Sequence, residues 1–393
     1  MSIELPSPTE FIKIASKTAR HFGFDSLDEL KAKRSKLEPR KTAPARIAVA
    51  DRKIDNLHGF LTSGISEYFE NNLHSSARPA LFSVIEEVPR TGDIALALHA
   101  VGVSKSIAET LLIQTMRSVL ADLGLQQNVV RINSLGDRES LNRYTRELTN
   151  FFKKRLEDMT PQARELFKDH AFIALDHLIE KQHDLAVRAP SPLEHLSDQS
   201  RKHFREIVEY LDMASIPYEI DSRLIGNHLC YSDALFTINL VDDNNDKIED
   251  APLIVRGGRY DEYVKRLTKQ NAPATGAVMI LKARKVPARL PKIEDAIRSV
   301  FVVQLGFGPK IKSLLLMEDL KRADISAYQE LSSDSLGDQL RLAESLDVPY
   351  SLILGQKEFV EGTVIVRDMK SRSQESVLAT NIVSHMRRLV RTR

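Results

Sequence analysis

The sequence predicts an α+β protein in which roughly the last 95 residues form a separate α/β domain. Three observations support this. Residues 81–85 and 95–101 read as two strands joined by the turn-rich segment 89–93. Residues 138–183 form a long, charged helical pattern within the strand-forming part of the chain. From residue 300 onward, short apolar strands alternate with helices, which is typical of a domain with a largely parallel sheet.

The composition is that of an ordinary globular protein. The 393 residues suffice for two or three domains, and 42% of them are hydrophobic. A net charge of 56 − 54 = +2 means that any nucleic-acid surface must be local. The single cysteine, Cys230, excludes a disulfide framework and a cysteine-rich metal site. With no signal-peptide pattern and no long apolar run, we expect a cytoplasmic protein without membrane contact.

The first 80 residues are predicted to be mainly helical. Apolar side chains recur at helical spacing over residues 11–22, and Gly23 ends this helix. Residues 27–36 form a short charged helix or link. A second helix is expected over about residues 43–72, with Gly59 and Gly64 as candidate breaks.

Helices and strands alternate after the predicted strand pair. A strongly periodic helix at 106–123 ends at Gly124, and a buried strand follows at 129–132. The charged stretch from 138 to about 200 is interpreted as a helical insertion. Ser197 is a candidate N-cap for a helix that reaches residue 214, and residues 218–220 and 234–241 then read as strands.

The last part of the chain begins after a predicted linker. Residues 285–298 are charged and contain Pro287 and Pro291, so a core is expected at 1–284 and a second domain at 299–393. The second domain is predicted to hold strands at 300–304, 326–328, 350–354 and 362–367, with helices at 311–322 and 336–345.

Several features have structural explanations that compete with functional ones. Gly306, Phe307 and Gly308 fit an ordinary strand-to-helix turn, because the third glycine of a phosphate loop is missing. No carboxylate stands at metal-ligand spacing from the nearby histidines, and no histidine is placed to activate Cys230, so we expect no metal and no cofactor. The histidines in question are His170, His177 and His183. The terminal arginines fit either phosphate contact or a solvated helix end; they are Arg387, Arg388, Arg391 and Arg393.

The sharpest local feature is the run Gly-Gly-Arg-Tyr-Asp at residues 257–261. Two glycines let the backbone approach a ligand closely, and Arg259 and Asp261 present opposite charges at the end of a strand. A tight strand-to-helix junction with an internal ion pair explains the same residues equally well.

In combination, five segments resemble the histidyl-tRNA synthetase family, in that family's order. They are Arg-Ile-Asn-Ser-Leu-Gly-Asp at 131–137, residues 197–204, the Gly-Gly-Arg-Tyr-Asp run, Pro-Ala-Thr-Gly at 273–276, and the block from 299 to the end. The last block resembles the family's anticodon-binding domain. The resemblance implies a class II synthetase fold: an antiparallel sheet flanked by helices, a helical insertion and a C-terminal α/β domain.

The segments that match the family's catalytic elements depart from its pattern. The family's Arg-x-Glu element corresponds to Glu-Glu-Val-Pro-Arg at 86–90, and Leu-Ala-Leu at 96–98 stands before His99 in place of the usual Arg and Gln. In the segment that matches Arg-Gly-Leu-Asp-Tyr-Tyr, Gly226 replaces the arginine and Cys230 replaces one tyrosine. The family's Gly-Leu-Glu-Arg is Ile-Leu-Lys-Ala at 280–283, with Arg284 one place late. Arg40 stands where the family's Leu-Arg-Pro-Glu-Gly-Thr-Ala has its glutamate.

These replacements predict the loss of aminoacylation. Adenylate formation needs clustered cations around the phosphates of ATP, and roughly three such arginines are missing together. Arg40 would in addition repel a substrate ammonium group. We therefore expect a noncatalytic protein that binds tRNA, or a tRNA-like RNA, through its C-terminal domain. Two alternatives stay open: a regulatory subunit resembling the synthetase-like partner of ATP phosphoribosyltransferase, and a divergent but active histidine–tRNA ligase.

The resemblance also implies site residues and partners. The remnant of the substrate pocket is expected to comprise Arg259, Tyr260, Asp261, Tyr231 and His99. The candidate RNA-binding cations are Lys310, Lys312, Arg341, Lys357 and Arg367, and no residue is expected to be catalytic. Class II relatives of this type pair through the motif 1 region, which is short here between residues 24 and 37, so we expect a homodimer or a protein partner that covers the same sheet edge.

Overall fold

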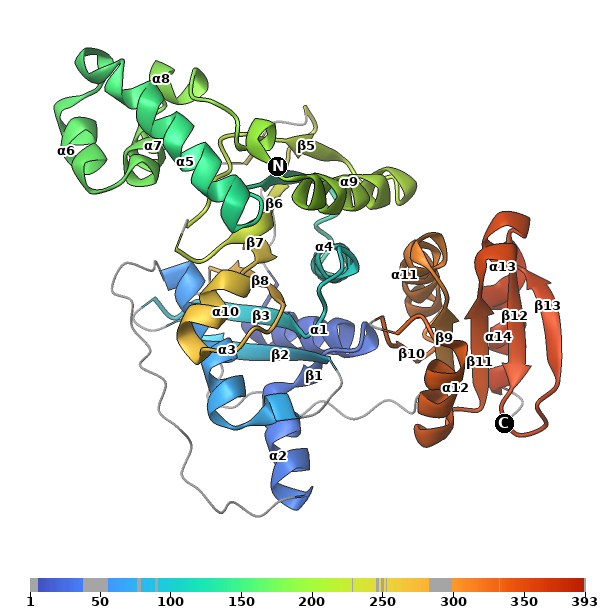
Figure 1. The fold of residues 1–393 in the computed structure, drawn as a ribbon. Coiled ribbons are helices and arrows are strands. Elements are labelled where there is room, and N and C mark those ends of the chain that lie inside the picture. Colours follow the sequence, from blue (N-terminus) through green and yellow to red (C-terminus); the bar gives the residue numbers. More distant parts are fainter. Residues whose placement is uncertain are drawn as a thin grey trace.

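The computed structural model describes residues 6–37, 56–75, 79–88, 91–227, 229–244, 247–248, 251, 253–282, 299–331 and 333–391, which form two β-sheets (Figure 1). Segments 38–55 and 283–298 lie outside this set, and with them Arg40, Arg284 and the predicted linker. His228 and residues 89–90 lie outside it as well.

The larger sheet has eight strands in the order β1-β2-β3-β8-β7-β6-β4-β5. The six inner strands pair antiparallel, and the two short edge strands run parallel to their neighbours. The predicted strand pair is confirmed: β2 and β3 pair over eight residues each. The bounds are β1 Asp25–Ser26, β2 Ala80–Glu87, β3 Ile94–Val101, β4 Asn128–Ser134, β5 Tyr218–Ile220, β6 Ser232–Leu240, β7 Leu253–Arg259 and β8 Ala274–Leu281.

Helices cover both faces of the large sheet. The helices α1 (Pro8–His21), α4 (Ile107–Asp122) and α9 (Asp198–Met213) share one hydrophobic core with the first face. The helices α3 (Asn56–Glu70) and α10 (Asp261–Thr268) share a second core with the other face. The short helices α2 (Leu27–Leu37) and η1 (Leu73–Ser75) lie near the β1 edge. Together the two cores bury both faces of the sheet.

One helix expectation is corrected. Helix α3 runs through Gly59 and Gly64 without a break. Gly64 is required by packing, because a Cβ there would lie 2.7 Å from Nε2 of His99 on β3. The glycine therefore allows the helix to lie close against the sheet, and it marks the approach of the helix backbone to the His99 side chain instead of a helix end.

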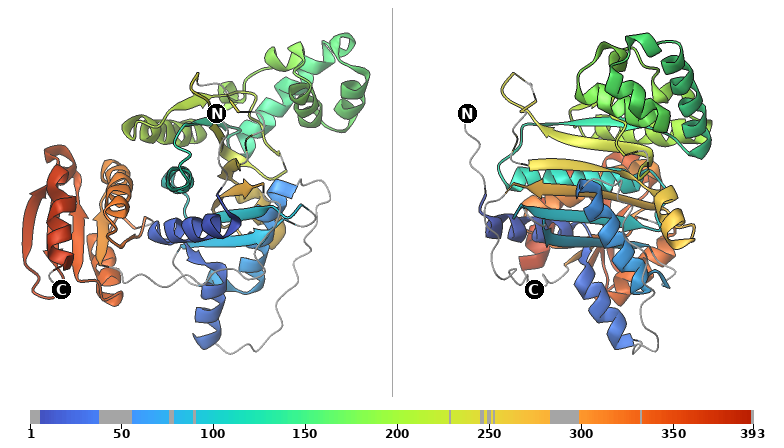
Figure 2. Two further views of the ribbon diagram at one scale, coloured as in Figure 1. Left: turned by 180° about the vertical axis from the view of Figure 1, so that it is seen from behind. Right: turned by 90° about the vertical axis from the view of Figure 1, so that its left-hand side faces the viewer.

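The predicted insertion is helical and leaves the sheet between β4 and β5. It comprises α5 (Arg138–Lys153), η2 (Leu156–Asp158), α6 (Pro161–Asp169), α7 (Ala171–Glu180), α8 (Asp184–Val187) and η3 (Pro192–His195), and is followed by α9. Ser197 is the N-cap of α9, as predicted: its hydroxyl accepts a hydrogen bond from the backbone N–H of Ser200 at 3.2 Å. The insertion and the C-terminal part lie on different sides of the large sheet (Figures 1 and 2).

The C-terminal part is built on the five-stranded sheet, in the order β10-β9-β11-β12-β13. Its elements are β9 Val300–Gln304, α11 Phe307–Arg322, β10 Ala327–Gln329, α12 Leu336–Ser345, β11 Tyr350–Leu354, α13 Gln356–Glu361, β12 Thr363–Asp368, β13 Gln374–Leu378, η4 Ala379–Asn381 and α14 Ile382–Arg391. The expectation of a largely parallel sheet is half right. Strands β10, β9 and β11 are parallel, whereas β12 and β13 pair antiparallel, because the six-residue α13 is too short to carry the chain back for a parallel strand.

The two sheets are joined through helices. Side chains of α11 belong to the same continuous core as those of α1 and α4, and Figure 1 shows α4 beside α11. The contact has a polar centre, in which Glu318 accepts hydrogen bonds from Ser118 (2.7 Å) and Gln114 (3.2 Å). None of the helices in the described parts of the chain is long and apolar enough to span a membrane.

Candidate functional site

Two of the predicted pocket residues meet in the interior of the large sheet. The ring of His99, on β3, lies flat against Phe82 with 4.6 Å between centroids, and its Nδ1 is 2.8 Å from the hydroxyl of Tyr260. Gly276 on the paired position of β8 leaves room for this contact, because a Cβ there would lie 2.8 Å from the tyrosine oxygen. Burial lowers the pKa of His99 to about 3, so this imidazole is neutral at physiological pH. It offers no charge to a ligand.

Arg259 is committed to a buried ion pair. Its Nε and one terminal nitrogen contact the two carboxylate oxygens of Glu109 on α4, at 2.8 and 3.0 Å. The remaining donors reach the carbonyl oxygens of Val103 (3.1 Å) and Lys105 (3.3 Å). The side chain of Arg259 is 2% exposed and that of Glu109 is fully buried. The arginine therefore joins β7 to the start of α4, and no surface of it faces solvent.

The charges around this pair are coupled. Burial would raise the pKa of Glu109, but Arg259 and His203 outweigh it and lower that pKa to about 2. Nε2 of His203 lies 2.9 Å from Oε1 of Glu109, the same oxygen that accepts from Nε of Arg259. Burial raises the pKa of Asp261 to about 6 even though Arg259 stands nearby. Asp261 accepts a hydrogen bond from the backbone N–H of Ala274 at 2.7 Å, which ties the start of α10 to the start of β8.

A large cleft lies elsewhere, between the insertion and the outer half of the large sheet. Its volume is about 980 Å³, and its walls come from α6, α7, the loop 221–231 and the strands β6 and β7. Of the five predicted pocket residues, only Tyr231 lines it. The structure therefore separates the predicted set: Tyr231 faces the cleft, while Arg259, Tyr260, Asp261 and His99 lie outside its walls.

The floor of the cleft contains a row that the sequence analysis missed. Arg131 on β4, Thr237 on β6 and Arg256 on β7 occupy directly paired positions and line the cleft together. Arg131 is bound to Glu219 at 2.9 Å, whereas Arg256 is exposed and makes no ion pair with any residue that the structure describes. The sequence carries little signal for it, because Leu253, Ile254 and Val255 are all apolar and the alternation of β7 appears only in the burial of its side chains.

The same loop carries Gly226, which stands where the resembling family has an arginine. Its φ of +54° lies in the left-handed region. A Cβ at this position would lie 2.8 Å from the ring of Tyr231 and 2.9 Å from Leu235. A larger side chain here would therefore require Tyr231 and Leu235 to move and would have to adopt a positive φ.

One of the predicted RNA-binding residues is corrected. Lys310, on α11, is only 3% exposed. Its amine donates to the carbonyl oxygen of Leu331 at 2.8 Å and pairs with Asp334 at 2.8 Å. Burial lowers the pKa of Lys310 in spite of Asp334. The lysine is on the buried side of α11, so its amine is not available to a phosphate.

The other four cations lie in different places. Lys357 is exposed at the start of α13, where β11 ends, and Lys312 is one turn along α11 from Gly308, which packs against Phe359 of α13. Arg341 is exposed in the middle of α12 and pairs with Asp338. Arg367 pairs with Ser351, at the opposite end of β11 from Lys357. The structure therefore places only Lys312 and Lys357 in one corner of the domain.

That corner also holds an aromatic residue. Phe307 follows β9 and is 37% exposed. The strands β9 and β11 are parallel neighbours, so the chain segments after them, at 305–307 and 355–357, lie at the same edge of the sheet. In the sequence, Phe307 was considered only as part of a turn. Its exposure is the signal that identifies the corner formed by Phe307, Lys312 and Lys357, which we call the strand-end corner.

Comparisons with known proteins agree with the architecture. Residues 300–389 match the family model described as "Anticodon binding domain". The histidine–tRNA ligase of Halalkalibacterium halodurans is 29% identical over 277 residues, which are 68% of this chain and 63% of that protein. The histidine–tRNA ligase of Geobacillus thermodenitrificans is 26% identical over 353 residues, 89% of this chain and 80% of that protein.

Among solved structures, the apo histidyl-tRNA synthetase of S. aureus aligns over 98% of this chain and 97% of its own, with 15% identity and a TM-score of 0.48. The sequence matches extend across the large sheet and the second sheet, and the second sheet is the matched anticodon-binding domain. The chain therefore belongs to the histidyl-tRNA synthetase family and carries that family's C-terminal anticodon-binding domain.

Proposed function

We propose that this chain is a noncatalytic member of its family that binds tRNA, or a tRNA-like RNA, through the strand-end corner of its C-terminal domain. The core, at about residues 1–284, serves in this proposal as a scaffold and the part from 299 onward as the RNA-binding domain. The observation that carries the noncatalytic part is the position of Gly226. The family's arginine is absent there, and Tyr231 and Leu235 would have to move to admit one.

Two further observations support the loss of catalysis. Strand β3, on which the family has Arg and Gln, is buried along its whole length and carries no cation. Arg259, which the chain retains, has its donors engaged by Glu109 and by backbone carbonyls. Catalysis of adenylate formation depends on positive groups that are free to hold phosphate oxygens. The cleft is lined instead by other cations, which are Arg131, Arg223, Lys247, Arg256 and Lys282.

The RNA-binding part is supported by the chemistry of the strand-end corner. Sequence-specific proteins bind single-stranded RNA by stacking unpaired bases on aromatic rings and by pairing phosphates with Lys or Arg. The corner offers the exposed ring of Phe307 and the amines of Lys312 and Lys357. The anticodon is such a single-stranded loop. The match of residues 300–389 to an anticodon-binding domain points to the same ligand class.

The experiment is a binding titration of total tRNA with the full chain at several salt concentrations. Phe307→Ala is expected to weaken binding by about 1–3 kcal/mol, the value of one stacked base. Lys357→Glu is expected to weaken binding and to reduce the dependence on salt by about one counterion. Lys370→Glu is the matched control, because Lys370 is exposed in the same domain in the turn after β12, away from the corner. Equal losses in Lys370→Glu and Lys357→Glu would remove the assignment of this surface, and no binding of any tRNA would remove the proposed function.

A further inference from the structure

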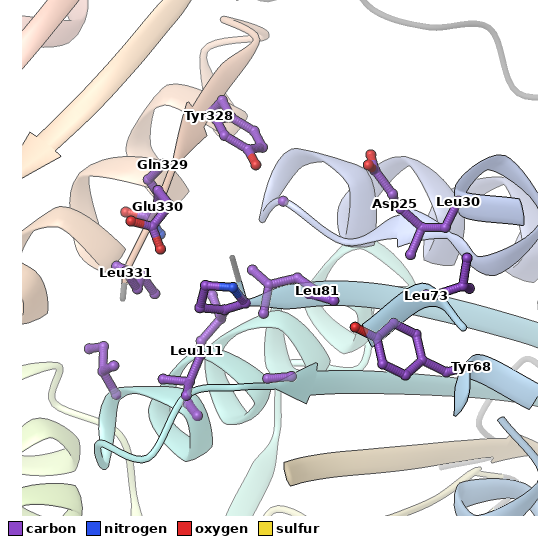
Figure 3. Close-up of a pocket in the computed structure, with 17 residues that line it drawn as sticks. Asp25, Leu30, Tyr68, Leu73, Leu81, Leu111, Tyr328, Gln329, Glu330 and Leu331 are labelled. Carbon is purple, nitrogen blue, oxygen red and sulfur yellow. The ribbon is translucent and has the colours of Figure 1, made fainter. Parts of the chain in front are cut away.

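A second cavity lies at the junction between the core and the C-terminal domain. We call it the junction cavity. It has a volume of about 260 Å³ and is separate from the cleft, with which it shares no residue. The core contributes residues from β1, α2, α3, η1, β2, β3 and α4 and from the loops beside them, and the C-terminal domain contributes residues 328–331 (Figure 3). Both domains must be docked for the cavity to exist in this form.

The walls of the junction cavity are mostly apolar. Aliphatic side chains from four core elements and from the C-terminal domain line it; they include Leu30, Leu73, Leu81, Ala108, Leu111 and Leu331. Such a surface gains free energy when an apolar molecule replaces water there. The volume is sufficient for a molecule of one or two rings, since cavities of about 150 Å³ already bind benzene.

One polar group interrupts the apolar wall. Tyr68, near the end of α3, is 2% exposed, and Figure 3 shows its hydroxyl directed toward the middle of the cavity. Its ring stacks on Phe82 with 5.0 Å between centroids, which fixes the direction of the hydroxyl. The hydroxyl makes no hydrogen bond with any residue that the structure describes. The oxygen is not among the fully buried polar atoms that lack a partner, so it is open to the cavity. A ligand with one polar group could therefore form a hydrogen bond with it.

The charges at the cavity limit the ligand class. Asp25 on β1 and Glu330 after β10 both line it, from opposite domains. Their carboxylates disfavour an anion in the same space. Burial raises the pKa of Tyr68 to about 12, so the group remains a neutral hydroxyl that both donates and accepts.

We propose that the junction cavity binds a small uncharged aromatic molecule of one or two rings that carries a single hydrogen-bonding group directed at Tyr68. The ligand contacts Leu111 of the core and Leu331 of the C-terminal domain at the same time. It therefore binds the docked arrangement of the two domains and stabilises it by mass action. A site of this kind makes domain docking responsive to a small molecule.

The test uses indole, 1-methylindole and benzoate as probes, with the full chain, in calorimetric or NMR titrations. Indole carries one N–H that can donate to Tyr68, 1-methylindole has the same rings without that donor, and benzoate is an anion of similar size. Indole is expected to bind with a Kd below about 1 mM. 1-Methylindole is expected to bind about threefold to tenfold more weakly, the value of one hydrogen bond, and benzoate not to bind.

Two variants localise the site. Tyr68→Phe is expected to remove the difference between indole and 1-methylindole, and Ala108→Phe is expected to abolish binding by filling the cavity. Tyr144→Phe is the matched control: this tyrosine is equally buried in the insertion and its hydroxyl also lacks a partner among the described residues. The proposal is overturned if indole does not bind up to its solubility limit. It is overturned in the same way if a second copy of the chain covers the cavity and so prevents indole from binding. It is overturned equally if Tyr68→Phe leaves the preference for indole unchanged, a result that does not depend on the folding of Ala108→Phe.

Discussion

At the scale of single residues, the ion pair between Glu109 and Arg259 is a fully buried polar contact between α4 and β7. Both side chains are buried, and the carboxylate accepts two hydrogen bonds from the guanidinium. Removing one partner of such a pair leaves an uncompensated charge in the interior. The pair therefore stabilises the junction between α4 and β7 only while both members are present.

We predict that Glu109→Gln lowers the free energy of unfolding at pH 7 by about 3–5 kcal/mol, measured by urea denaturation. The pKa of Glu109 is lowered from 4.5 to about 2 in the fold, so its stabilising contribution is complete above pH 4.5 and is lost as the pH falls toward 2. As the pH is lowered from 4.5 to 2, the free energy of unfolding should accordingly fall less in Glu109→Gln than in the parent protein. Glu139→Gln, at an exposed pair with Arg143, is the control and should cost at most about 1 kcal/mol. Equal effects of the two substitutions would contradict this account.

Gly226 gives a second prediction at this scale. Gly226→Arg should destabilise the protein by more than Gly124→Arg in the same denaturation measurement. Both glycines have positive φ, +54° and +78°, so both variants suffer backbone strain. Only position 226 adds a steric clash, with Tyr231 and Leu235, whereas nothing lies within 4 Å of a Cβ at position 124. If the two variants were equally stable, the packing around Gly226 would not be the reason why an arginine is excluded.

The sequence predicted part of this site. The resemblance to the family identified Arg259 and Gly226, because both stand in short ordered motifs. It did not identify Glu109, which is 150 positions from Arg259 and belongs to a helix with no motif of its own. The predicted pocket residues do not share one wall: Tyr231, just before β6, lines the cleft, whereas Arg259 at the end of β7 is bound to Glu109 of α4. Burial of Lys310 was equally invisible, since the pattern of α11 shows helical spacing but not which domain covers it.

At the scale of elements, the attachment of the insertion depends on one cluster of hydrogen bonds. Asp137 caps α5 by accepting from the backbone N–H of Ser140 at 2.9 Å, and its second oxygen accepts from the hydroxyl of Ser197 at 2.7 Å. Ser197 caps α9 in turn, and its backbone N–H donates to the hydroxyl of Ser140 at 2.8 Å. The helices that open and close the insertion are thus capped by one shared network.

We predict that Asp137→Ala destabilises the protein by about 2 kcal/mol and raises amide hydrogen exchange at the starts of both α5 and α9, because both caps use its carboxylate. Thr160→Ala is the matched control, since Thr160 caps only α6 through the backbone N–H of Ala163 at 3.2 Å. Its effect on exchange should remain within α6. Exchange that rose only in α5 after Asp137→Ala would show that the two caps are independent.

Local signals explain which elements were predicted correctly. Ser197 was recognised as a cap because capping is a property of neighbouring residues, but the link from Asp137 to Ser197 spans 60 positions and has no local signature. Strand β13 was missed because its residues are mostly exposed and lack an apolar alternation. The antiparallel half of the second sheet was missed for the related reason that strand direction depends on the length of α13, which the pattern did not resolve.

At the scale of the whole molecule, a polar network fixes the C-terminal domain on the core. Glu318 of α11 accepts from Ser118 and Gln114 of α4, and Tyr210 of α9 donates to Gln114 at 2.7 Å. Lys321 donates to Ser118 at 2.6 Å and pairs with Asp122 at 2.7 Å. Apolar side chains surround this network and continue from one domain into the other. The C-terminal domain is therefore docked, and point variants in the full chain are better tests than isolated domains.

We predict that Glu318→Lys releases the C-terminal domain and increases the radius of gyration in small-angle scattering. The substitution places a third cation beside Lys321 and Arg322 and removes the acceptor of two hydrogen bonds. Asp319→Lys reverses the same charge on the neighbouring, exposed position of α11 and should leave the radius unchanged. An unchanged radius in Glu318→Lys, with the fold intact by circular dichroism, would mean that apolar contacts alone hold the domains together.

The central proposal is that the chain does not activate histidine, and its most direct test is histidine-dependent ATP–pyrophosphate exchange by the purified full chain. Leu96, Ala97 and Leu98 stand where the family has Arg and Gln, and Gly226 stands where it has another arginine. The retained Arg259 is bound to Glu109. We therefore predict exchange no greater than that of a reaction without histidine, while the same preparation binds tRNA. Exchange that requires histidine and rises in proportion to the protein concentration would contradict the account and would make the chain a divergent histidine–tRNA ligase.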